Sequence, residues 1–211
     1  MKVLSPFGPK IAIVKIPKKI INNINLEVDK IIGDKKRLKK SDYSKKLVGQ
    51  VMQEIKLDNK FIRKNLLKFV KDNIKKYVKQ SSKRNVKRIS LKSLWVVRQF
   101  KNEYNPIHWH GGHISGAGFL KVPKTLGTFV QDKGDKVYKG GTLNLIHGSR
   151  QFLSHSIFQI KPKVGNFYLF PNYMMHTVYP FKGTDDERRS ISFNANIDPN
   201  IYNVYANYVK K

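Results

Sequence analysis

Two histidines separated by one residue are the clearest sign of chemistry in this sequence. His108 and His110 flank Trp109 in the segment NPIHWHGGH. Side chains two residues apart on a strand point to the same face, so both imidazoles can reach one metal ion. A third candidate, His176, lies in FPNYMMHTV, where a strand that begins after a Pro turn would bring it in from an opposing strand. On spacing alone, a His-x-His pair is more often a hydrogen-bonded surface or core feature than a metal site.

Three protein ligands on one side of a metal leave positions for a bidentate co-substrate and oxygen. Non-haem Fe(II) oxygenases need this arrangement, but imidazole suits Fe, Zn, Cu and Ni alike. The three histidines therefore predict a metal centre without fixing the metal.

A polar face near the C-terminus could bind an anion. In GTDDERRSISFNAN the polar residues Arg188, Ser190, Ser192 and Asn194 alternate with a largely apolar set. If the polar face points into a barrel, Arg188 can bind a carboxylate through two hydrogen bonds and Ser190 can add its hydroxyl. The alternative is an ion pair between Arg188 and an acidic residue of the turn at 185–187.

The N-terminal part must supply elements that support these residues. Residues 10–16 are rich in Ile and Val and predict a strand, after which Pro17 can begin a helix that runs to about Gly33. Residues 34–46 are polar and basic without an apolar period, and predict a loop. Apolar residues at helical spacing over 59–80, with lysines on the other side, predict one long helix that packs on a sheet.

From residue 89 onward the sequence consists of short β-like runs divided by Gly and Pro turns. The predicted strands cover residues 89–100, 114–122, 142–146, 152–160, 166–170, 176–179 and 188–194. Seven or eight short strands indicate a β-sandwich or a jelly-roll barrel, so the fold class is mainly β with N-terminal helices. We expect one structural domain, in which the basic strand and helices of residues 1–88 pack on a core of residues 89–211.

The composition limits the chemistry further. The sequence has no cysteine, which excludes disulfides and thiolate zinc sites, so a metal must bind to His, Asp or Glu. No apolar run reaches the roughly 20 residues that span a bilayer. The start of the chain also lacks the long apolar stretch and small-residue cleavage site of a secretory signal. We therefore expect a soluble, intracellular protein of the cytoplasm.

The net charge of +28 is concentrated in the N-terminal part. Residues 1–90 carry 26 basic and 7 acidic side chains, a net of +19. Such a field attracts nucleic acid, anionic lipid or an acidic protein. Only eight of the 42 basic residues are Arg, which fits diffuse attraction or solubility better than the reading of a base sequence. A polyanion contact through the N-terminal region and a simple bias of composition both remain open.

Four pieces of the sequence, in order, resemble the Fe(II)/2-oxoglutarate-dependent dioxygenase superfamily, in particular its phage and bacterial branch. They are HWHGGHISGAGFLKVP, GTLNL, PKVGNFYLFPNYMMHTVYP and RRSISFN, within residues 108–194. The resemblance implies a double-stranded β-helix core. It also implies that Fe(II) binds at His108, His110 and His176, and that 2-oxoglutarate binds through Arg188 and Ser190.

The resemblance further implies a reaction. Oxygen and 2-oxoglutarate would be consumed, succinate and CO2 released, and a C–H bond of an unidentified second substrate hydroxylated. One position departs from the common pattern, because His110 stands where the superfamily usually has Asp or Glu. Three neutral ligands leave the iron its full charge, which favours an anionic co-substrate but changes metal preference and redox tuning.

Several other residues are weaker candidates for the site. His113 is a rival for the third ligand position, and residues before the motif could hydrogen-bond the co-substrate: Gln99, Tyr104 and Asn105. His147 and His155 have no partner at ligand spacing and are expected to be structural or surface residues. The glycine-containing loop 125–140 could cover the site as a lid, or be a plain solvent loop.

Two other classes of function remain open. The first is a cupin-like metal-binding protein with the same barrel and no oxygenase activity, for which His110 is the best argument. The second is a nucleic-acid-binding protein that uses the basic N-terminal region, a role that an oxygenase acting on nucleic acid would share.

Overall fold

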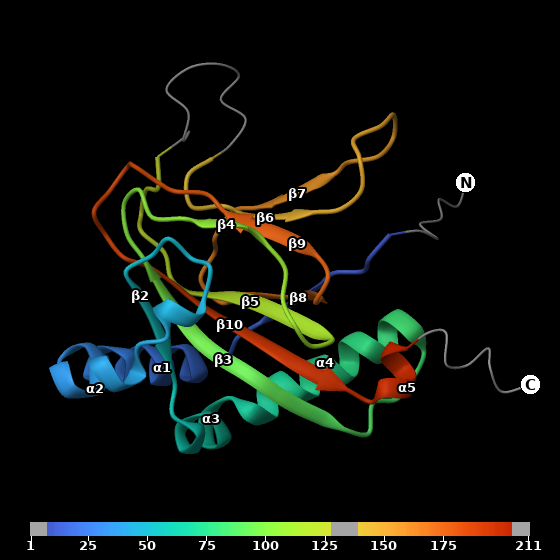
Figure 1. Ribbon diagram of the computed structural model, residues 1–211, viewed down its shortest axis with the longest axis horizontal. Coiled ribbons are helices and arrows are strands. Elements are labelled where there is room, and N and C mark those ends of the chain that lie inside the picture. Colours follow the sequence, from blue (N-terminus) through green and yellow to red (C-terminus); the bar gives the residue numbers. More distant parts are fainter. Residues whose placement is uncertain (1–7, 128–138, 204–211) are drawn as a thin grey trace, which may run out of the picture.

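The computed structural model describes residues 8–127 and 139–203, which form two facing antiparallel sheets with helices on one side (Figure 1). The larger sheet contains, in spatial order, β1 (Ala12–Lys15), β8 (Asn166–Pro171), β5 (Ile114–Lys121), β10 (Arg188–Ile197), β3 (Ile89–Gln99) and β2 (Gln53–Lys56). The smaller sheet contains β4 (Asn105–His108), β9 (Met175–Val178), β6 (Leu143–Ile146) and β7 (Ile157–Ile160). This arrangement is a double-stranded β-helix, which confirms the predicted fold class.

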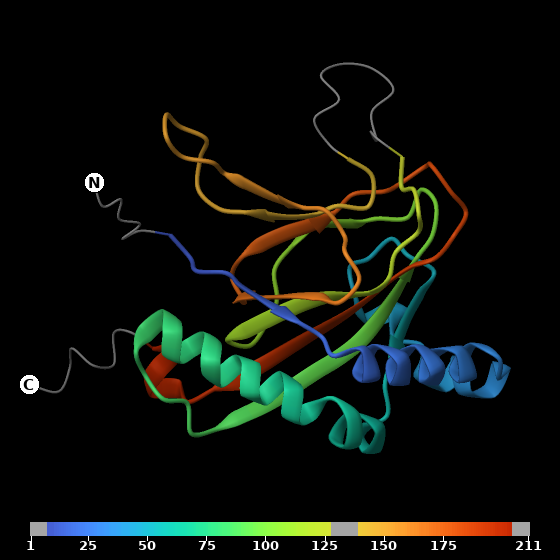
Figure 2. The ribbon, with the colours of Figure 1, turned by 180° about the vertical axis from the view of Figure 1, so that it is seen from behind.

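The helices cover the outer face of the larger sheet (Figure 2). They are α1 (Lys18–Ile32), α2 (Lys35–Ser41), α3 (Asn59–Asn65), α4 (Leu67–Ser82) and the single turn α5 (Pro199–Tyr202). The short 3-10 helix η1 (Ser44–Lys46) lies instead beside β2. The apolar side of α1 is made by Ile21, Ile24, Val28 and Ile31, a spacing that keeps all four on one face of a helix. In the part of the chain that the structure describes, no helix is long and apolar enough to cross a membrane.

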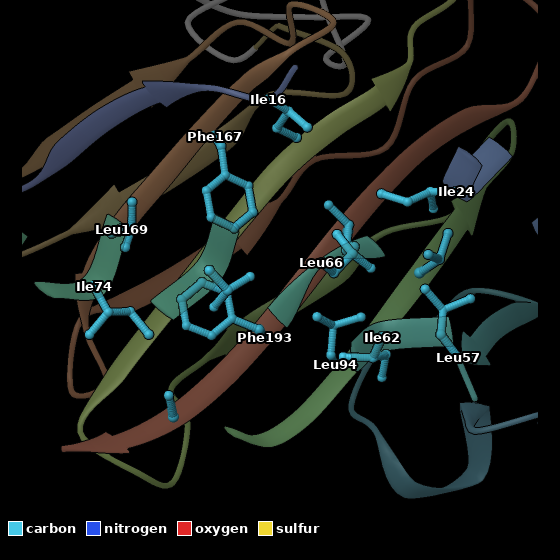
Figure 3. Packing of buried hydrophobic residues seen from close by; sticks show 14 of the residues in the cluster. Ile16, Ile24, Leu57, Ile62, Leu66, Ile74, Leu94, Phe167, Leu169 and Phe193 are labelled. Atoms are coloured by element: carbon cyan, nitrogen blue, oxygen red, sulfur yellow. The ribbon is translucent and has the colours of Figure 1, made fainter. Parts of the chain in front are cut away.

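The main hydrophobic core lies between these helices and the larger sheet. Figure 3 shows Leu66 and Ile74 of the helical layer facing Phe167 and Phe193 of the sheet. Burial of such side chains contributes roughly 1.5–3 kcal/mol each relative to exposure. The helices are therefore part of the core that holds β10 and β3 in place.

Two glycines of β5 let this core approach the sheet closely. A Cβ at Gly116 would collide with the ring of Phe193, and one at Gly118 would collide with the ring of Phe167. The rings of Phe167 and Phe193 stack with their centroids 5.7 Å apart. They occupy the space that a side chain at position 116 or 118 would need.

A second, smaller core fills the space between the two sheets. Its buried members are Phe119, Leu143, Leu145, Ile160, Tyr168, Phe170 and Met174. They come from both sheets, so this core fixes the distance between the strands that carry the histidines and the strand that carries Arg188.

Several element predictions were wrong. The basic segment 34–46 is not a loop: Asp34 caps α2 by accepting from the backbone N–H groups of Lys36 and Arg37, and Leu38 packs against the main core. The single helix expected over 59–80 is two helices that meet at Leu66.

Other differences concern strands and loops. The strand expected over 152–160 begins only at Ile157. The four-residue strand β2 and the turn α5 were not predicted. Most of the proposed lid, residues 128–138, lies outside the described residues.

Candidate metal centre

The structure brings His108, His110 and His176 together between the two sheets. His108 is the last residue of β4 and lies opposite His176 of β9 in the strand register, while His110 follows two residues after the strand ends. One ring nitrogen from each imidazole falls within 4.8 Å of the others, and the Nε2 atoms of His110 and His176 are 3.1 Å apart. Two nitrogen ligands of one ion, each about 2.1 Å from it, are at most about 4.2 Å apart, so the separations in this cluster are close to those of ligands that share an ion.

Backbone contacts hold the ligand residues in place. The backbone N–H of His110 donates to the carbonyl of Asn172, and the side-chain amide of Asn172 donates to the carbonyl of His110. The hydroxyl of Thr177 donates to the carbonyl of Asn105, which joins β9 to β4. These contacts tie the turn after β4 to the turn before β9, so segments far apart in the sequence present their imidazoles to one point.

The protonation of the imidazoles suits metal binding. The Nδ1 of His108 lies 2.7 Å from the carbonyl of Pro106, and the Nδ1 of His176 lies 2.9 Å from the carbonyl of Met174. Because a carbonyl only accepts, each Nδ1 carries the proton and each Nε2 keeps a free lone pair.

Burial keeps these rings neutral. It lowers the pKa of His110 to about 4 and that of His176 to about 3, with the neighbouring histidines as the smaller cause. Burial also lowers the pKa of His108. Neutral imidazole is the form that ligates a metal, so near neutral pH all three rings are ready to bind.

Arg188 lies in the same cavity, at the start of β10. Its side chain is 2% exposed and its guanidinium lies 5.1 Å from the ring centre of Phe119. The only hydrogen bond found for it among the described residues is a long one, 3.4 Å from Nη1 to the Oγ of Ser190, and its Nε has no partner. Burial lowers the pKa of Arg188 to about 10. A buried cation with unused donors is suited to an anionic ligand.

The acidic turn before β10 does not neutralise Arg188. Glu187 bonds instead to Arg98 and Arg189, with closest distances of 2.7 Å to each, and Asp185 pairs with Lys101 on the surface. The ion-pair alternative raised by the sequence is therefore not what the described residues show.

The three histidines and Arg188 line one cavity of about 40 Å³. Its polar lining is made by Asn105, His108, His110, His176, Arg188, Ser190 and Ser192, and its apolar lining includes Trp95, Phe119, Leu143 and Phe170. The alternation predicted for the last strand is visible here, because the polar face of β10 points into the cavity while Ile191 and Phe193 point into the main core.

Of the weaker candidates for the site, only Asn105 lines the cavity. His113 is not in the cluster: it accepts a hydrogen bond from the backbone of Ile197 and stacks on Tyr202. Gln99 is buried, and its amide donates to the carbonyls of Glu103 and Tyr179. The exposed Tyr104 is not among the residues that line the cavity, whereas Asn105 is.

His147 and His155 are exposed, as expected. They border a separate groove beside the β6–β7 hairpin.

Trp95 and Glu54 lie behind His110 and were not predicted from the sequence. The ring of Trp95 on β3 meets that of His110 edge-on, with centroids 5.7 Å apart. Its indole N–H donates to Glu54 on β2, a carboxyl that is 1% exposed. Burial raises the pKa of Glu54 to about 7. The alternation of β3 could have indicated that Trp95 and Val97 share a face, but nothing in the sequence pairs β2 with β3.

Comparison with known proteins agrees with this geometry. Residues 93–194 match a family model described as "Putative 2OG-Fe(II) oxygenase". The matched segment runs from β3 to β10 and includes all three histidines, Arg188 and Ser190. A comparison with curated protein sequences found no match.

Solved structures share the fold at low sequence identity. A prolyl hydroxylase from Trichoplax adhaerens, in complex with a hypoxia inducible factor oxygen degradation domain peptide fragment, superposes with a TM-score of 0.58 at 13% identity, covering 91% of this chain and 85% of that one. A Pseudomonas putida prolyl-4-hydroxylase gives 0.56 at 12% identity, covering 89% and 91%. The viral collagen prolyl hydroxylase of Paramecium Bursaria Chlorella virus-1, in its 2OG complex, gives 0.54 at 15% identity, covering 88% and 94%. Identities this low establish a common fold alone.

Proposed function

Because this chain belongs to the 2OG-Fe(II) oxygenase superfamily, whose members use Fe(II) and 2-oxoglutarate, we propose that it is a dioxygenase with its iron on His108, His110 and His176. Arg188, assisted by Ser190, binds the distal carboxylate of 2-oxoglutarate in this proposal. The strongest support for it is the buried guanidinium, which has no counter-charge among the described residues and lies in the same cavity as three neutral imidazoles.

The residues present fit the two groups. The Nε2 lone pairs of His108 and His176, together with the neutral ring of His110, are suitable ligands for Fe(II), and no negative ligand competes for its charge among the described residues. The unpartnered Nε of Arg188 and its Nη1 are donors without strong acceptors, and a carboxylate would supply both. The apolar side chains of Phe119 and Leu143 exclude water, which strengthens such an ion pair.

When bound, iron and 2-oxoglutarate together supply the oxidation of a substrate C–H bond to C–OH by O2, with succinate and CO2 as co-products. The protein contributes geometry. The pairing of β4 with β9 fixes the imidazoles, and β10 places Arg188 deeper in the same cavity. Trp95, held by its hydrogen bond to Glu54, limits the movement of His110.

The proposed activity is tested by succinate formation from 2-oxoglutarate in the presence of Fe(II) and oxygen. The wild type should form succinate even without a second substrate, as slow uncoupled turnover, and the His176→Ala variant should form none. If the wild type binds iron but never produces succinate, the chain is a metal-binding protein of the cupin kind.

The basic N-terminal helices are not part of this site. Helix α4, which carries exposed lysines, packs on the outer face of the larger sheet, across that sheet from the strands that carry His108 and His176 (Figure 2). A polyanion bound to α4 would therefore lie on the opposite side of the larger sheet from the cavity. Contact with nucleic acid through the N-terminal region therefore remains a separate proposal from the choice of substrate.

A further inference from the structure

One edge strand of the sheets lacks the usual protection against pairing. In the described part of the chain the sheet edges are β1, β2, β4 and β7. The first two carry charged residues, Lys15 on β1 and Glu54 and Lys56 on β2, and β4 carries Pro106. The fourth, β7, reads Ile-Phe-Gln-Ile and has neither a charge nor a proline. Charges and prolines on edge strands keep other chains from adding to a sheet, so their absence leaves β7 open to an added strand.

Two apolar side chains of β7 are also exposed. Ile157 is 39% and Phe158 is 47% exposed. The hairpin that leads into β7 extends beyond the smaller sheet, above the chain that leads into β1 (Figure 1). Such apolar side chains mark an interaction site only as part of a contiguous apolar surface, which the groove beside this strand supplies.

A groove of about 540 Å³ runs beside this strand. It lies between the chain before β1 and the β6–β7 hairpin, and its lining includes Pro9, Ile11, Leu145, Ile157 and Phe158. Consecutive strand residues point to opposite faces, so a groove bordered by both Ile157 and Phe158 follows the edge of β7. None of the described residues that line it is Lys, Arg, Asp or Glu, in a chain where these make up 27% of the sequence.

The groove is continuous with the wall of the metal centre. Leu145, which lines the groove, lies opposite His176 in the strand register, and Leu143, two residues before it on the same face of β6, lines the cavity. Met174 lines the groove and accepts the hydrogen bond from the Nδ1 of His176. A molecule bound in the groove is therefore separated from the metal-binding histidines by one layer of residues.

We infer that this groove binds an extended, uncharged polypeptide segment of the substrate, which pairs with the free edge of β7 as an added strand. This inference rests on the proposed function, because it names the class of molecule that the oxygenase acts on. The edge supplies main-chain hydrogen bonds, and the apolar pockets select neutral side chains on alternate positions. An edge of four residues offers about 13 Å of pairing.

Other occupants fit less well. A phosphate backbone needs Lys or Arg in contact, and the lining has neither. A second copy of this chain would bring another +28 of charge against the first. A neutral peptide meets neither obstacle.

The experiment uses the full-length protein with Fe(II) and 2-oxoglutarate, without oxygen for binding and with oxygen for turnover. The probe is a pool of synthetic peptides of about ten residues built from Ala, Val, Ile, Thr, Asn, Gln and Pro, long enough to pair along the whole edge. Matched pools carry Asp or phosphoserine at alternate positions. Binding is measured by fluorescence anisotropy, and the gain of one oxygen atom by mass spectrometry.

Two lysine variants separate the edge from the surface around it. Phe158→Lys places a charge on the edge strand and should weaken binding of the uncharged pool at least tenfold. Leu153→Lys adds the same charge on the hairpin at a residue that is 90% exposed and does not line the groove, and it should bind like the wild type. Phe158→Leu should keep most of the affinity, and circular dichroism checks that each variant is folded.

Four results would overturn the inference. The first is equal binding of the uncharged pool by the wild type and Phe158→Lys. The second is tighter binding of the acidic or phosphorylated pool at this groove. The third is self-association that Phe158→Lys abolishes, which would assign the edge to a second copy. The fourth is peptide binding that appears only after deletion of residues 1–7, which would assign the groove to the chain's own N-terminal segment.

The two proposals fail separately. Succinate formation without any peptide binding would refute this inference and leave the oxygenase assignment intact. Peptide binding that Phe158→Lys weakens, in a protein that never forms succinate, would support the groove and refute the assignment.

Discussion

Replacing Arg188 by Met should make the protein more stable without co-substrate and remove its response to 2-oxoglutarate. The buried guanidinium has no counter-charge among the described residues, and burial lowers its pKa to about 10. This lowering corresponds to about 3 kcal/mol of unfavourable free energy at neutral pH, where the arginine is charged in both the folded and the unfolded chain. Loss of the contact with Phe119 costs about 1 kcal/mol. Arg188→Met should therefore raise the free energy of unfolding by about 2 kcal/mol, the difference of these terms.

With 2-oxoglutarate bound, the wild type should be more stable than the Arg188→Met variant. At a 2-oxoglutarate concentration of about 100 times its Kd, the wild type gains about 2.7 kcal/mol of stability and the variant gains none. Both changes in the free energy of unfolding can be measured by urea unfolding of the anaerobic Fe(II) protein, monitored by circular dichroism with and without 2-oxoglutarate.

A matched control lies one residue away. Arg189 is equally buried but is paired with Glu187 and Asp29, so Arg189→Met should lower the free energy of unfolding by about 3 kcal/mol or more. An Arg188→Met protein that is less stable than the wild type, yet still stabilised by 2-oxoglutarate, would refute our account of Arg188.

Three further predictions concern the ligands, the support behind them and the basic surface. Metal analysis should find no iron in His176→Ala and one iron per chain in His113→Ala. If only His113→Ala loses iron, His113 and not His176 is the third ligand. Burial raises the pKa of Glu54 to about 7, so the folded chain holds a proton that the unfolded chain releases near pH 4.5. Stability should fall by up to about 3 kcal/mol as pH rises between these values, and Glu54→Gln should flatten the profile in urea unfolding at pH 5 and pH 8. If the basic N-terminal region binds duplex DNA, log affinity should fall with log salt by about 0.9 per phosphate contacted, and neutralising the basic residues of 35–40 should reduce that slope; an unchanged slope would remove them from the contact.

Local patterns in the sequence predicted the parts of the site that depend on strand alternation. The polar alternation from Arg188 to Ser192 depends only on the alternating directions of side chains along a strand, and β10 shows it. His108 and His110 were expected on one strand, but His110 lies two residues beyond the end of β4, so the turn after the strand places it beside His108. The structure places all of these residues around one cavity, with His176 from the strand that was expected to oppose them. Their roles as ligands of iron and 2-oxoglutarate remain proposals.

Features that depend on long-range pairing were not visible in the sequence. The contact of Glu54 with Trp95 requires β2 to pair with β3, about forty residues further along the chain, and the four-residue β2 has no distinct pattern. The helix α2 was missed because its stability comes from the Asp34 cap and from the packing of Leu38, not from an apolar period. The open edge of β7 likewise became evident only once the strand order was known.

The central claim is that one cavity holds Fe(II) and 2-oxoglutarate together. Calorimetric titration of 2-oxoglutarate into the anaerobic protein, with and without Fe(II), tests it most directly. We predict one 2-oxoglutarate per chain with iron present, strongly weakened binding without iron, and no detectable binding to the Arg188→Met variant. Binding of equal strength with and without iron, or no binding to the iron-loaded wild type, would contradict the account.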